Sequence, residues 1–354
     1  MEESMMSWRL DPKVENILKK GEDCIGLSED EAQTLLCLDL GSKEVYALME
    51  TANRISREQF KGKGESHFHI GVNVEPCRFN CKFCSLAENV GVFTERIEFG
   101  EEEILTWARA AEQSHVDALN IMTTGTYSLT RLIDIGKLLN KEVSIPLVAN
   151  TRDITHREGE ELLKAGFVGA YHAIRLGEGK DTSFALEKRL RTISVFKDIG
   201  LLWMNCVEPV GPEHTVEEIS YLMVLARKHG ATYSGVMRRI NFSGSPFEKV
   251  GMISELELAR MVAVSRLVMG DVPKAHCTHE PHVASLISGA NLFFPEVGSS
   301  PRDRHADTGE GRGRSIAACQ QMFTEMGWDP DLPSNCFDSV SPAKTLDAAA
   351  GAKA

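Results

Sequence analysis

The chain repeats one pattern that strongly limits its fold. Eight short apolar stretches typical of β-strands recur along it, and most are separated by a segment with helical periodicity. The stretches cover residues 68–74, 117–122, 144–149, 167–172, 201–206, 232–237, 271–277 and 291–296. Eight strand and helix pairs predict an α/β fold of the (β/α)8 TIM-barrel type. No G-x-G-x-x-G fingerprint follows a strand, which disfavours an open doubly wound sheet.

The segments that flank this pattern have a different character. Asp11 and Pro12 begin one predicted helix, Ser28 and Glu31 form a capping box for a second, and a third follows Ser42. Beyond Cys336 the apolar pattern fades, which predicts a loosely ordered end. The predicted parts are an N-terminal helical extension (1–62), the barrel (63–328) and a C-terminal tail (329–354).

Composition narrows the class of protein. The formal net charge of −12 disfavours a nucleic-acid surface, because phosphate binding relies on clustered Lys and Arg. The first twenty residues do not resemble a signal peptide, and no run of about 18 apolar residues occurs. We therefore expect a cytoplasmic protein with a small-molecule substrate and neither nucleic acid nor membrane as partner. In a reducing compartment, the nine cysteines indicate metal ligands, reactive groups or core residues rather than disulfides.

Three cysteines lie close together just after the first predicted strand. Cys77, Cys81 and Cys84 form a C-x3-C-x2-C motif, with Phe83 before the last cysteine. The carboxyl end of a barrel strand is where such folds place their chemistry. Three thiolates can hold a [4Fe-4S] cluster and leave its fourth iron open, whereas structural zinc takes four protein ligands. A zinc site and a redox disulfide remain as weaker alternatives.

This motif resembles the signature of the radical S-adenosylmethionine (SAM) superfamily. The helical residues 27–60 and the sequence GANLFF at 289–294 are similar to the branch that contains biotin synthase, the [FeFe]-hydrogenase maturase and methylornithine synthase. The resemblance implies that the open iron binds SAM and that reductive cleavage yields a 5'-deoxyadenosyl radical, which takes hydrogen from a substrate. It implies a flavodoxin- or ferredoxin-type electron donor and a transferase-like role in cofactor or amino-acid biosynthesis.

The resemblance also implies a set of SAM-binding positions. A turn after the second strand meets the SAM amino group in the family, although the family's glutamate is missing from MTTGT here. A polar run after the fourth strand binds the ribose, and an arginine in the next helix pairs with the SAM carboxylate through two parallel hydrogen bonds. The corresponding residues are Phe83 beside the cluster, Thr124, Gly125 and Thr126 in the turn, Arg175 and Glu178 in the run, and Arg189 in the helix.

Polar residues at other strand ends are candidates for the substrate. Arg238 and Arg239 are neighbours, so one faces the barrel lumen and the other the helices, and the pattern does not say which. The inward arginine would anchor an anionic group such as a carboxylate. His276 is a candidate proton donor or a polar strand-end residue. Asn205, Glu208 and Glu296 complete this group.

The other cysteines leave a second iron-sulfur cluster open as a hypothesis. Cys206 and Cys277 fall near strand ends where biotin synthase holds such a cluster, but the regions around Met122 and Asn150 carry no matching cysteine. An auxiliary site could instead use Cys24, Cys37, Cys319 and Cys336. With a second cluster the protein could insert sulfur, as biotin and lipoyl synthases do. A non-catalytic iron-sulfur assembly or electron-transfer protein is the third alternative.

A glycine-rich, charged loop follows the last predicted strand. It covers residues 297–315 and would lie at the barrel mouth. We expect either a lid, a docking segment for a protein partner, or a solvated connection.

Overall fold

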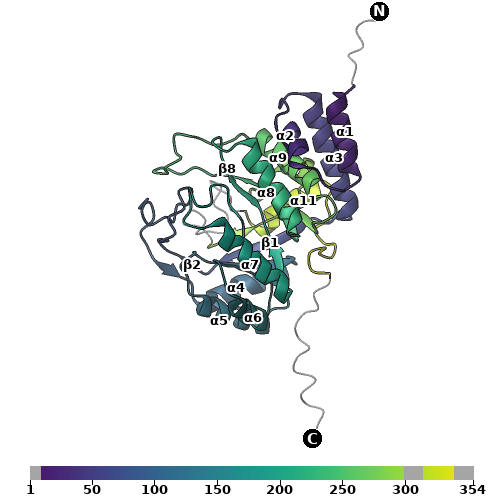
Figure 1. Ribbon diagram of the computed structural model, residues 1–354. Helices are drawn as coiled ribbons and strands as arrows, with labels where there is room; N and C mark the ends of the chain where they lie inside the picture. Colours follow the sequence, from purple (N-terminus) through teal and green to yellow (C-terminus); the bar gives the residue numbers. More distant parts are fainter. Residues whose placement is uncertain (1–8, 299–313, 339–354) are drawn as a thin grey trace, which may run out of the picture.

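Parallel strands close into a barrel in the computed structural model, which describes residues 9–298 and 314–338 (Figure 1). Within those residues eight strand positions form the wall, two of them in two pieces: β1 (Glu65–Gly71), β4 (Ala118–Met122), β5 (Leu147–Asn150), β6 (Phe167–Tyr171), β7 (Leu202–Met204) with β8 (Val207–Val210), β9 (Tyr233–Arg238), β10 (Ala275–Cys277) and β11 (Leu292–Phe293) with β12 (Glu296–Val297). Since β10 pairs with both β9 and β11, and β11 pairs with β1, the ring closes. The predicted (β/α)8 barrel is confirmed.

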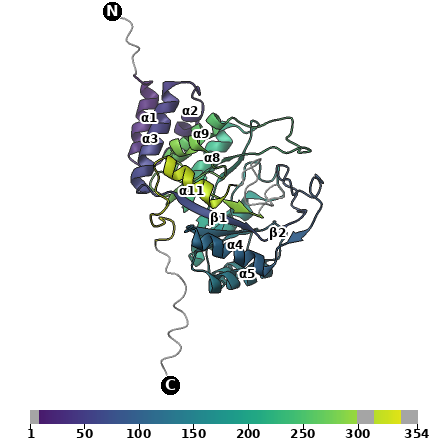
Figure 2. The ribbon, with the colours of Figure 1, turned by 180° about the vertical axis from the view of Figure 1, so that it is seen from behind.

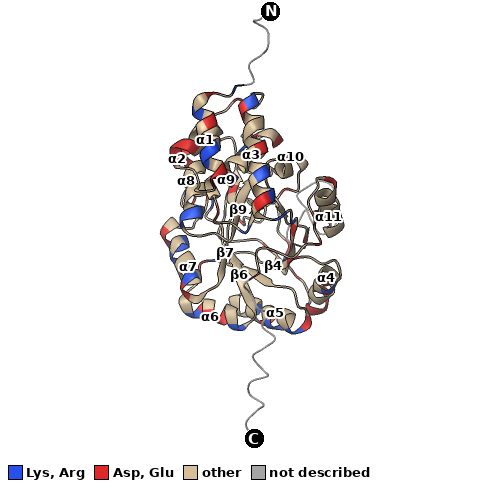
Figure 3. Ribbon diagram, turned by 90° about the vertical axis from the view of Figure 1, so that its right-hand side faces the viewer, with Lys and Arg blue, Asp and Glu red and all other residues tan. Residues whose placement is uncertain are grey.

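Helices surround the barrel and turn their polar faces outward. They are α4 (Glu101–Gln113), α5 (Leu129–Glu142), α6 (His156–Lys164), α7 (Leu186–Ile199), α8 (Val216–Lys228), α9 (Glu255–Met269), α10 (Val283–Ile287) and α11 (Ile316–Glu325). Figure 3 shows the charged residues mainly on these outer helices, while the central strands carry few. A small antiparallel pair, β2 (Asn73–Val74) with β3 (Ile97–Glu98), flanks the cysteine loop. None of the helices within the described ranges combines the length and apolar character needed to cross a membrane.

Three helices precede the barrel: α1 (Pro12–Glu22), α2 (Glu29–Leu36) and α3 (Lys43–Gln59). Their N-caps are the expected Asp11, Ser28 and Ser42, because each side chain accepts a backbone N–H of the first turn. They pack on α8 and α9 (Figure 2). Their buried residues join the same hydrophobic cluster as the barrel helices. The proposed boundary at residue 62 therefore divides the sequence without dividing the core.

The predicted tail begins with a segment that is part of the packed structure. The backbone N–H of Asn335 and the hydroxyl of Ser334 donate to the Glu65 carboxylate over 2.7 and 2.8 Å. Cys336 and Phe337 are buried against the lumen residues of the barrel. Residues 329–338 thus close the amino-terminal end of the barrel. The expectation of a loose end beyond Cys336 is wrong for Phe337, which is buried. Residues 339–354 lie outside the described residues.

The lumen of this barrel is unusually polar. Side chains alternate along a strand, so Glu65, His67 and His69 of β1 share the lumen face, while Phe68 and Ile70 join the core under the helices. Barrel interiors are more often filled with branched apolar side chains. A polar lumen indicates that the interior is used for binding as well as for packing.

Candidate active site

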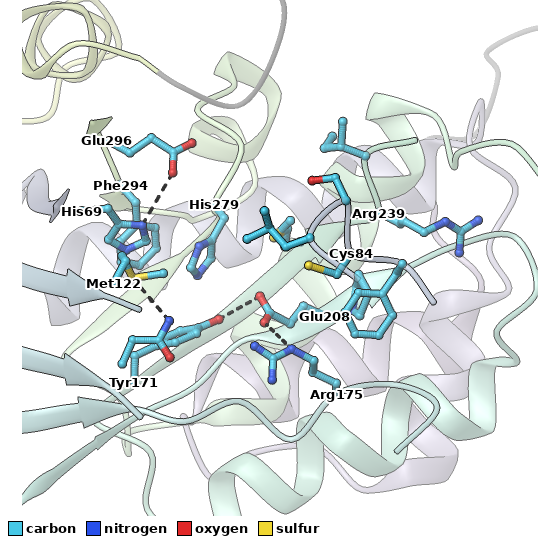
Figure 4. A pocket seen from close by; sticks show the side chains of 17 residues that line it. His69, Cys84, Met122, Tyr171, Arg175, Glu208, Arg239, His279, Phe294 and Glu296 are labelled. Carbon is cyan, nitrogen blue, oxygen red and sulfur yellow. Dashed lines mark hydrogen bonds and ion pairs between the residues drawn. The ribbon is translucent and has the colours of Figure 1, made fainter. Parts of the chain in front are cut away.

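A cavity of about 220 Å³ opens at the carboxyl ends of the strands. Residues from several strands and from the cysteine loop line it (Figure 4). Its titratable side chains, apart from the cysteine and tyrosine discussed below, are His69, Arg175, Glu208, Arg239, His279 and Glu296. The arrangement matches the position at which (β/α)8 barrels carry out their chemistry.

The three-cysteine loop borders this cavity and is closed by its own backbone. The N–H of Cys77 donates to Leu86 over 2.7 Å, and the Cys77 carbonyl accepts from Glu88 over 3.1 Å. The N–H of Cys84 donates to the Cys81 carbonyl over 3.0 Å. Cys84 and its neighbour Phe83 line the cavity, and all three cysteines are partly exposed. The loop therefore turns at least one thiol toward the space where a ligand would lie.

The three thiols are not gathered as closely as the ligands of one metal ion. Around one tetrahedral zinc, Zn–S bonds of about 2.3 Å bring sulfur atoms to roughly 3.8 Å from one another. Two groups of three donors within 4.8 Å occur among the described residues, and Cys77, Cys81 and Cys84 are not one of them. Burial, offset in part by Arg175, raises the pKa of Cys81 to about 12, so a metal must displace a proton there.

The loop is docked on the segment that follows β6. The Lys82 ammonium lies 2.9 Å from the Asp181 carboxylate, and the Lys82 N–H donates to the Asp181 carbonyl over 2.9 Å. The Phe79 ring packs on Phe184 with centroids 4.5 Å apart. A fixed backbone of this kind keeps three thiolates in position for one cluster.

The predicted turn after β4 also contacts the loop. The Thr124 N–H donates to the Asn73 amide oxygen over 3.0 Å, and the Asn73 amide donates back to the Thr124 hydroxyl over 2.8 Å. A Cβ atom on Gly125 would lie 2.5 Å from the Phe79 ring and 3.6 Å from the Cys77 sulfur. Glycine is therefore needed for the close approach, and exposed Thr126 follows it. These three residues adjoin the loop but do not line the cavity.

Three of the predicted SAM residues lie together beside the loop. Arg189 is 2% exposed, and its guanidinium lies 3.3 Å from Glu178, 3.4 Å from Asp153 and 4.2 Å above the Phe184 ring. Glu178 also accepts the backbone N–H of Arg175 over 3.2 Å. Burial lowers the pKa of Arg189, although the two carboxylates oppose that shift. A SAM carboxylate would therefore compete with Glu178 and Asp153 for this arginine.

Arg175 reaches the cavity itself. Its Nε lies 3.4 Å from one Glu208 oxygen, and the Tyr171 hydroxyl donates to the other over 2.8 Å (Figure 4). Burial opposes the charge on Arg175, but Glu208, Cys81 and Glu178 together outweigh it and raise the Arg175 pKa. The Glu208 carboxylate is thus held between a cation and a hydroxyl at the cavity wall. Glu208 was among the strand-end candidates, whereas Tyr171 was missed.

The structure distinguishes the two neighbouring arginines at the carboxyl end of β9. Arg239 lines the cavity and is 2% exposed. Its guanidinium contacts Glu213 and stacks 4.4 Å above the Phe247 ring, and its Nε has no hydrogen-bond partner among the described residues. Arg238 instead pairs with Glu280 over 2.6 Å and is not part of the lining. Only Arg239 keeps the predicted position.

His276 does not lie in the cavity, contrary to its assignment as a catalytic candidate. Its Nε2 lies 2.9 Å from the Val262 carbonyl of α9, on the outer side of the barrel wall. The next residue, Cys277, belongs to the lumen cluster. Because neighbouring side chains in a strand point to opposite faces, His276 cannot reach a substrate held in the lumen.

The buried histidines predict an acid-sensitive fold. Burial, reinforced by Arg266, lowers the pKa of His276 to about 3, and burial with Arg189 lowers that of His172 to about 4. The unfolded chain takes up these protons near the ordinary pKa of 6.5, so stability is lost as pH falls from about 6.5 toward these values. We expect the free energy of unfolding to fall by a few kcal/mol, roughly 1.4 per pKa unit, when urea unfolding is measured across that range. His276→Asn should flatten the slope, and an unchanged slope would contradict this account.

Sequence reasoning missed His69, one of two histidines that line the cavity. His69 lies on the lumen face of β1, with its ring nitrogen 4.0 Å from the Glu296 carboxylate (Figure 4). His279 stacks on Phe294 with ring centroids 4.1 Å apart and also lines the cavity. The alternation in ESHFHIG could have indicated this position. Glu65, His67 and His69 are two residues apart and share one face of the strand, opposite the apolar Phe68 and Ile70.

The remaining cysteines do not gather into one site. Cys206 and Cys277 come together with His279, while Cys336 lies with Glu65 and His67 near the other end of the barrel. Buried Cys319 belongs to a separate core under α11. Cys24 packs at the edge of the main core, and Cys37 is exposed. An auxiliary cluster built from Cys24, Cys37, Cys319 and Cys336 is therefore not assembled among the described residues.

Comparison with known sequences gives distant relatives. No family model matches the chain. Biotin synthase of Geobacter sulfurreducens is 27% identical over 321 residues, covering 85% of this chain and 92% of that protein. An uncharacterized protein of Methanocaldococcus jannaschii is 23% identical over 327 residues, covering 86% and 84%. Biotin synthase of Chlorobaculum parvum is 24% identical over 280 residues, covering 74% and 82%.

Solved structures share the fold. Methylornithine synthase (PylB) superposes with a TM-score of 0.75 at 15% identity, covering 89% of this chain and 97% of that one. The FeFe-hydrogenase maturase HydG from Carboxydothermus hydrogenoformans gives a TM-score of 0.72 at 16% identity, covering 92% and 81%. The cysteine loop, the biotin synthase relatives and the shared fold together indicate a radical SAM enzyme. The chain is similar in sequence to biotin synthases and in fold to HydG and PylB.

Proposed function

We propose that this enzyme cleaves SAM at a [4Fe-4S] cluster held by Cys77, Cys81 and Cys84 and abstracts hydrogen from a small, carboxylate-bearing metabolite. The observation that carries the proposal is the position of the loop, whose Cys84 borders a cavity with two arginines in its wall. When bound, the cluster and SAM supply a 5'-deoxyadenosyl radical, which can attack a C–H bond that acid and base cannot. The product would belong to cofactor or amino-acid biosynthesis.

The side chains of the cavity support an anionic, polar substrate. Arg239 lines the cavity and is buried with an Nε that donates to no described residue, so rotation of its side chain toward the cavity would let it pair with a substrate carboxylate. Glu208 and Tyr171 offer a hydrogen-bonding wall on the opposite part of the cavity. Phe83, Met237 and Phe294 supply apolar surface that limits water around the reacting carbon. A flavodoxin- or ferredoxin-type protein would deliver the electron.

SAM binding would use the residues beside the loop. Thr124, Gly125 and Thr126 would meet the SAM amino group through the backbone of the turn. Arg189 would pair with the SAM carboxylate after exchange with Glu178 or Asp153, and Arg175 with Glu178 would face the ribose. Their common location against the cysteine loop supports these roles.

Reductive cleavage of SAM tests the proposal directly. Anaerobically reconstituted protein with a chemical reductant should convert SAM to 5'-deoxyadenosine and methionine, measured by liquid chromatography and mass spectrometry. Deuterated candidate metabolites should pass deuterium into 5'-deoxyadenosine, and the labelled position identifies the attacked carbon. An intact cluster whose spectrum ignores SAM, with no 5'-deoxyadenosine formed, would favour the assembly or electron-transfer alternative.

Sulfur insertion is a second candidate, because biotin synthases are among the relatives. It requires a second cluster that contains inorganic sulfide. Met122 and Asn150, which line the cavity, cannot act as thiolate ligands there, although Cys206 and Cys277 lie close together. Acid-labile sulfide well above the roughly four atoms of one [4Fe-4S] cluster would favour this candidate.

The predicted docking of a protein partner at 297–315 concerns residues that lie almost entirely outside the described ranges. We retain it as part of the proposal. Crosslinking of the holoenzyme to its electron donor would test it.

A further inference from the structure

Two cysteines and one histidine meet inside the barrel without any part in the cysteine loop. Cys206 lies between β7 and β8, Cys277 ends β10, and His279 follows two residues later. The exposed fractions of these residues are 0%, 0% and 7%. Their donor atoms, two sulfurs and one ring nitrogen, all lie within 4.8 Å of one another. Such proximity between Cys206 and the end of β10, two parts of the wall that β9 separates, needs an explanation.

The strand between them carries no side chain that separates the two cysteines. Met204 pairs with Tyr233 and Val207 with Val236, so Cys206 lies level with Gly235 of β9. Gly235 in turn pairs with Cys277. A Cβ atom on Gly235 would lie 1.7 Å from the Cys277 carbonyl oxygen, so only glycine allows this close approach of the two strands. The middle position of the row Cys206–Gly235–Cys277 therefore has no side chain between the two thiols.

Hydrogen bonds to the backbone do not explain why the two thiols lie so close together. The Cys277 thiol reaches the Asn205 carbonyl at 3.7 Å, and the Cys206 thiol reaches the Val207 carbonyl at 4.0 Å. Thiols are weak donors, so these contacts add little to stability. By contrast, the three donor atoms lie within 4.8 Å of one another. This limit is only about 1 Å longer than the roughly 3.8 Å that separates sulfur ligands around one tetrahedral ion.

We propose that Cys206, Cys277 and His279 bind one thiophilic divalent metal ion, ferrous iron or zinc, inside the barrel. Two thiolates balance the charge of a divalent ion and the imidazole is neutral, so the complex carries no net charge into a low-dielectric lumen. Sulfur and imidazole donors suit zinc and iron, whereas magnesium and calcium prefer oxygen. Three protein ligands leave one position open, as in catalytic zinc sites.

The open position would face the substrate. His279 lines the cavity beside Tyr171, with ring centroids 5.1 Å apart (Figure 4). The two cysteines are fully buried and are not part of the lining. An ion in this place could bind an oxygen, nitrogen or sulfur atom of the substrate as a Lewis acid. The site uses none of Cys77, Cys81 and Cys84, so this inference stands apart from the proposed SAM chemistry.

Cobalt binding tests the proposal without any catalytic assay. The full chain carrying Cys77→Ser, Cys81→Ser and Cys84→Ser is kept reduced under anaerobic conditions and titrated with Co²⁺. We expect one equivalent to give thiolate-to-cobalt charge-transfer absorption and the intense visible bands of a tetrahedral ion. Adding Cys206→Ser or Cys277→Ser should abolish the charge-transfer band, and His279→Ala should weaken binding by at least about 10-fold.

Two matched controls separate this site from other cysteines. Cys319→Ser changes a buried cysteine of another core and should leave the spectrum unchanged. Cys336→Ser removes the only thiol of the group with Glu65 and His67, and loss of the band in this variant would overturn the assignment. So would a folded protein with no thiolate–cobalt band, or a disulfide between Cys206 and Cys277. If the serine variants unfold, the wild-type chain loaded with the iron-sulfur cluster is given one equivalent of zinc instead. X-ray absorption at the zinc edge must then show two sulfur ligands on the zinc ion.

Discussion

Replacing Cys77, Cys81 or Cys84 with serine should remove the [4Fe-4S] cluster and with it nearly all SAM cleavage. Serine is nearly the size of cysteine, but its hydroxyl does not replace a thiolate as an iron ligand. We expect reconstituted protein to fall from about four irons per chain at this loop to a small residual content, and 5'-deoxyadenosine formation to fall by at least about 10³-fold. Iron analysis, electron paramagnetic resonance and product quantification measure the three effects.

Folding should survive these substitutions, because the loop is closed by its own backbone hydrogen bonds and by the Lys82–Asp181 pair. The serine substitutions leave these backbone and ion-pair contacts in place and remove only the thiols, which are weak hydrogen-bond donors. Cys37→Ser, at an exposed cysteine far from the loop in sequence, is the matched control and should keep iron and activity. If a loop variant retained the cluster signal while Cys37→Ser lost it, the ligand assignment would be wrong.

The architecture was accessible from sequence because it depends on local patterns. Each predicted strand coincides with, overlaps or contains an observed one, since short apolar runs bounded by polar turns can only be buried in the barrel wall. The helix starts at Asp11, Ser28 and Ser42 follow from side chains that accept the first-turn N–H groups. The cysteine loop was equally clear, because its spacing is specific.

The wrong predictions concerned the side of the barrel wall that a side chain faces and contacts between residues far apart in sequence. The alternation of side chains along a strand predicts that Arg238 and Arg239 face opposite sides of the barrel wall. Which of them faces the lumen depends on how β9 packs on β10 and α9. The packing of β10 likewise turns His276 toward α9 and away from the substrate space. Glu65 accepts hydrogen bonds from Ser334 and Asn335, which lie 269 and 270 positions away in sequence, so no local signal could show that the tail is anchored there.

Arg189 joins the proposed SAM site to the fold, so its replacement should affect both. Arg189→Met leaves Glu178 and Asp153 facing a side chain that cannot neutralise them. Breaking a buried ion pair from one side costs about 3–5 kcal/mol, so we expect a clear loss in the free energy of unfolding by urea. Arg191→Met, at an exposed position on the same helix, is the matched control and should change stability by less than about 0.5 kcal/mol.

A conservative variant separates binding from stability. Arg189→Lys keeps the positive charge but loses the planar pair of donors that meets a carboxylate, so it should fold while binding SAM about 10- to 100-fold more weakly. Equilibrium SAM binding to the cluster-loaded variant, followed by its spectral change, measures this. Adding Glu178→Gln to Arg189→Met should recover stability without recovering SAM affinity, because it removes a buried charge and restores no partner for the ligand. Wild-type affinity in Arg189→Lys would show that Arg189 acts only through Glu178 and Asp153, as part of the scaffold beneath the loop.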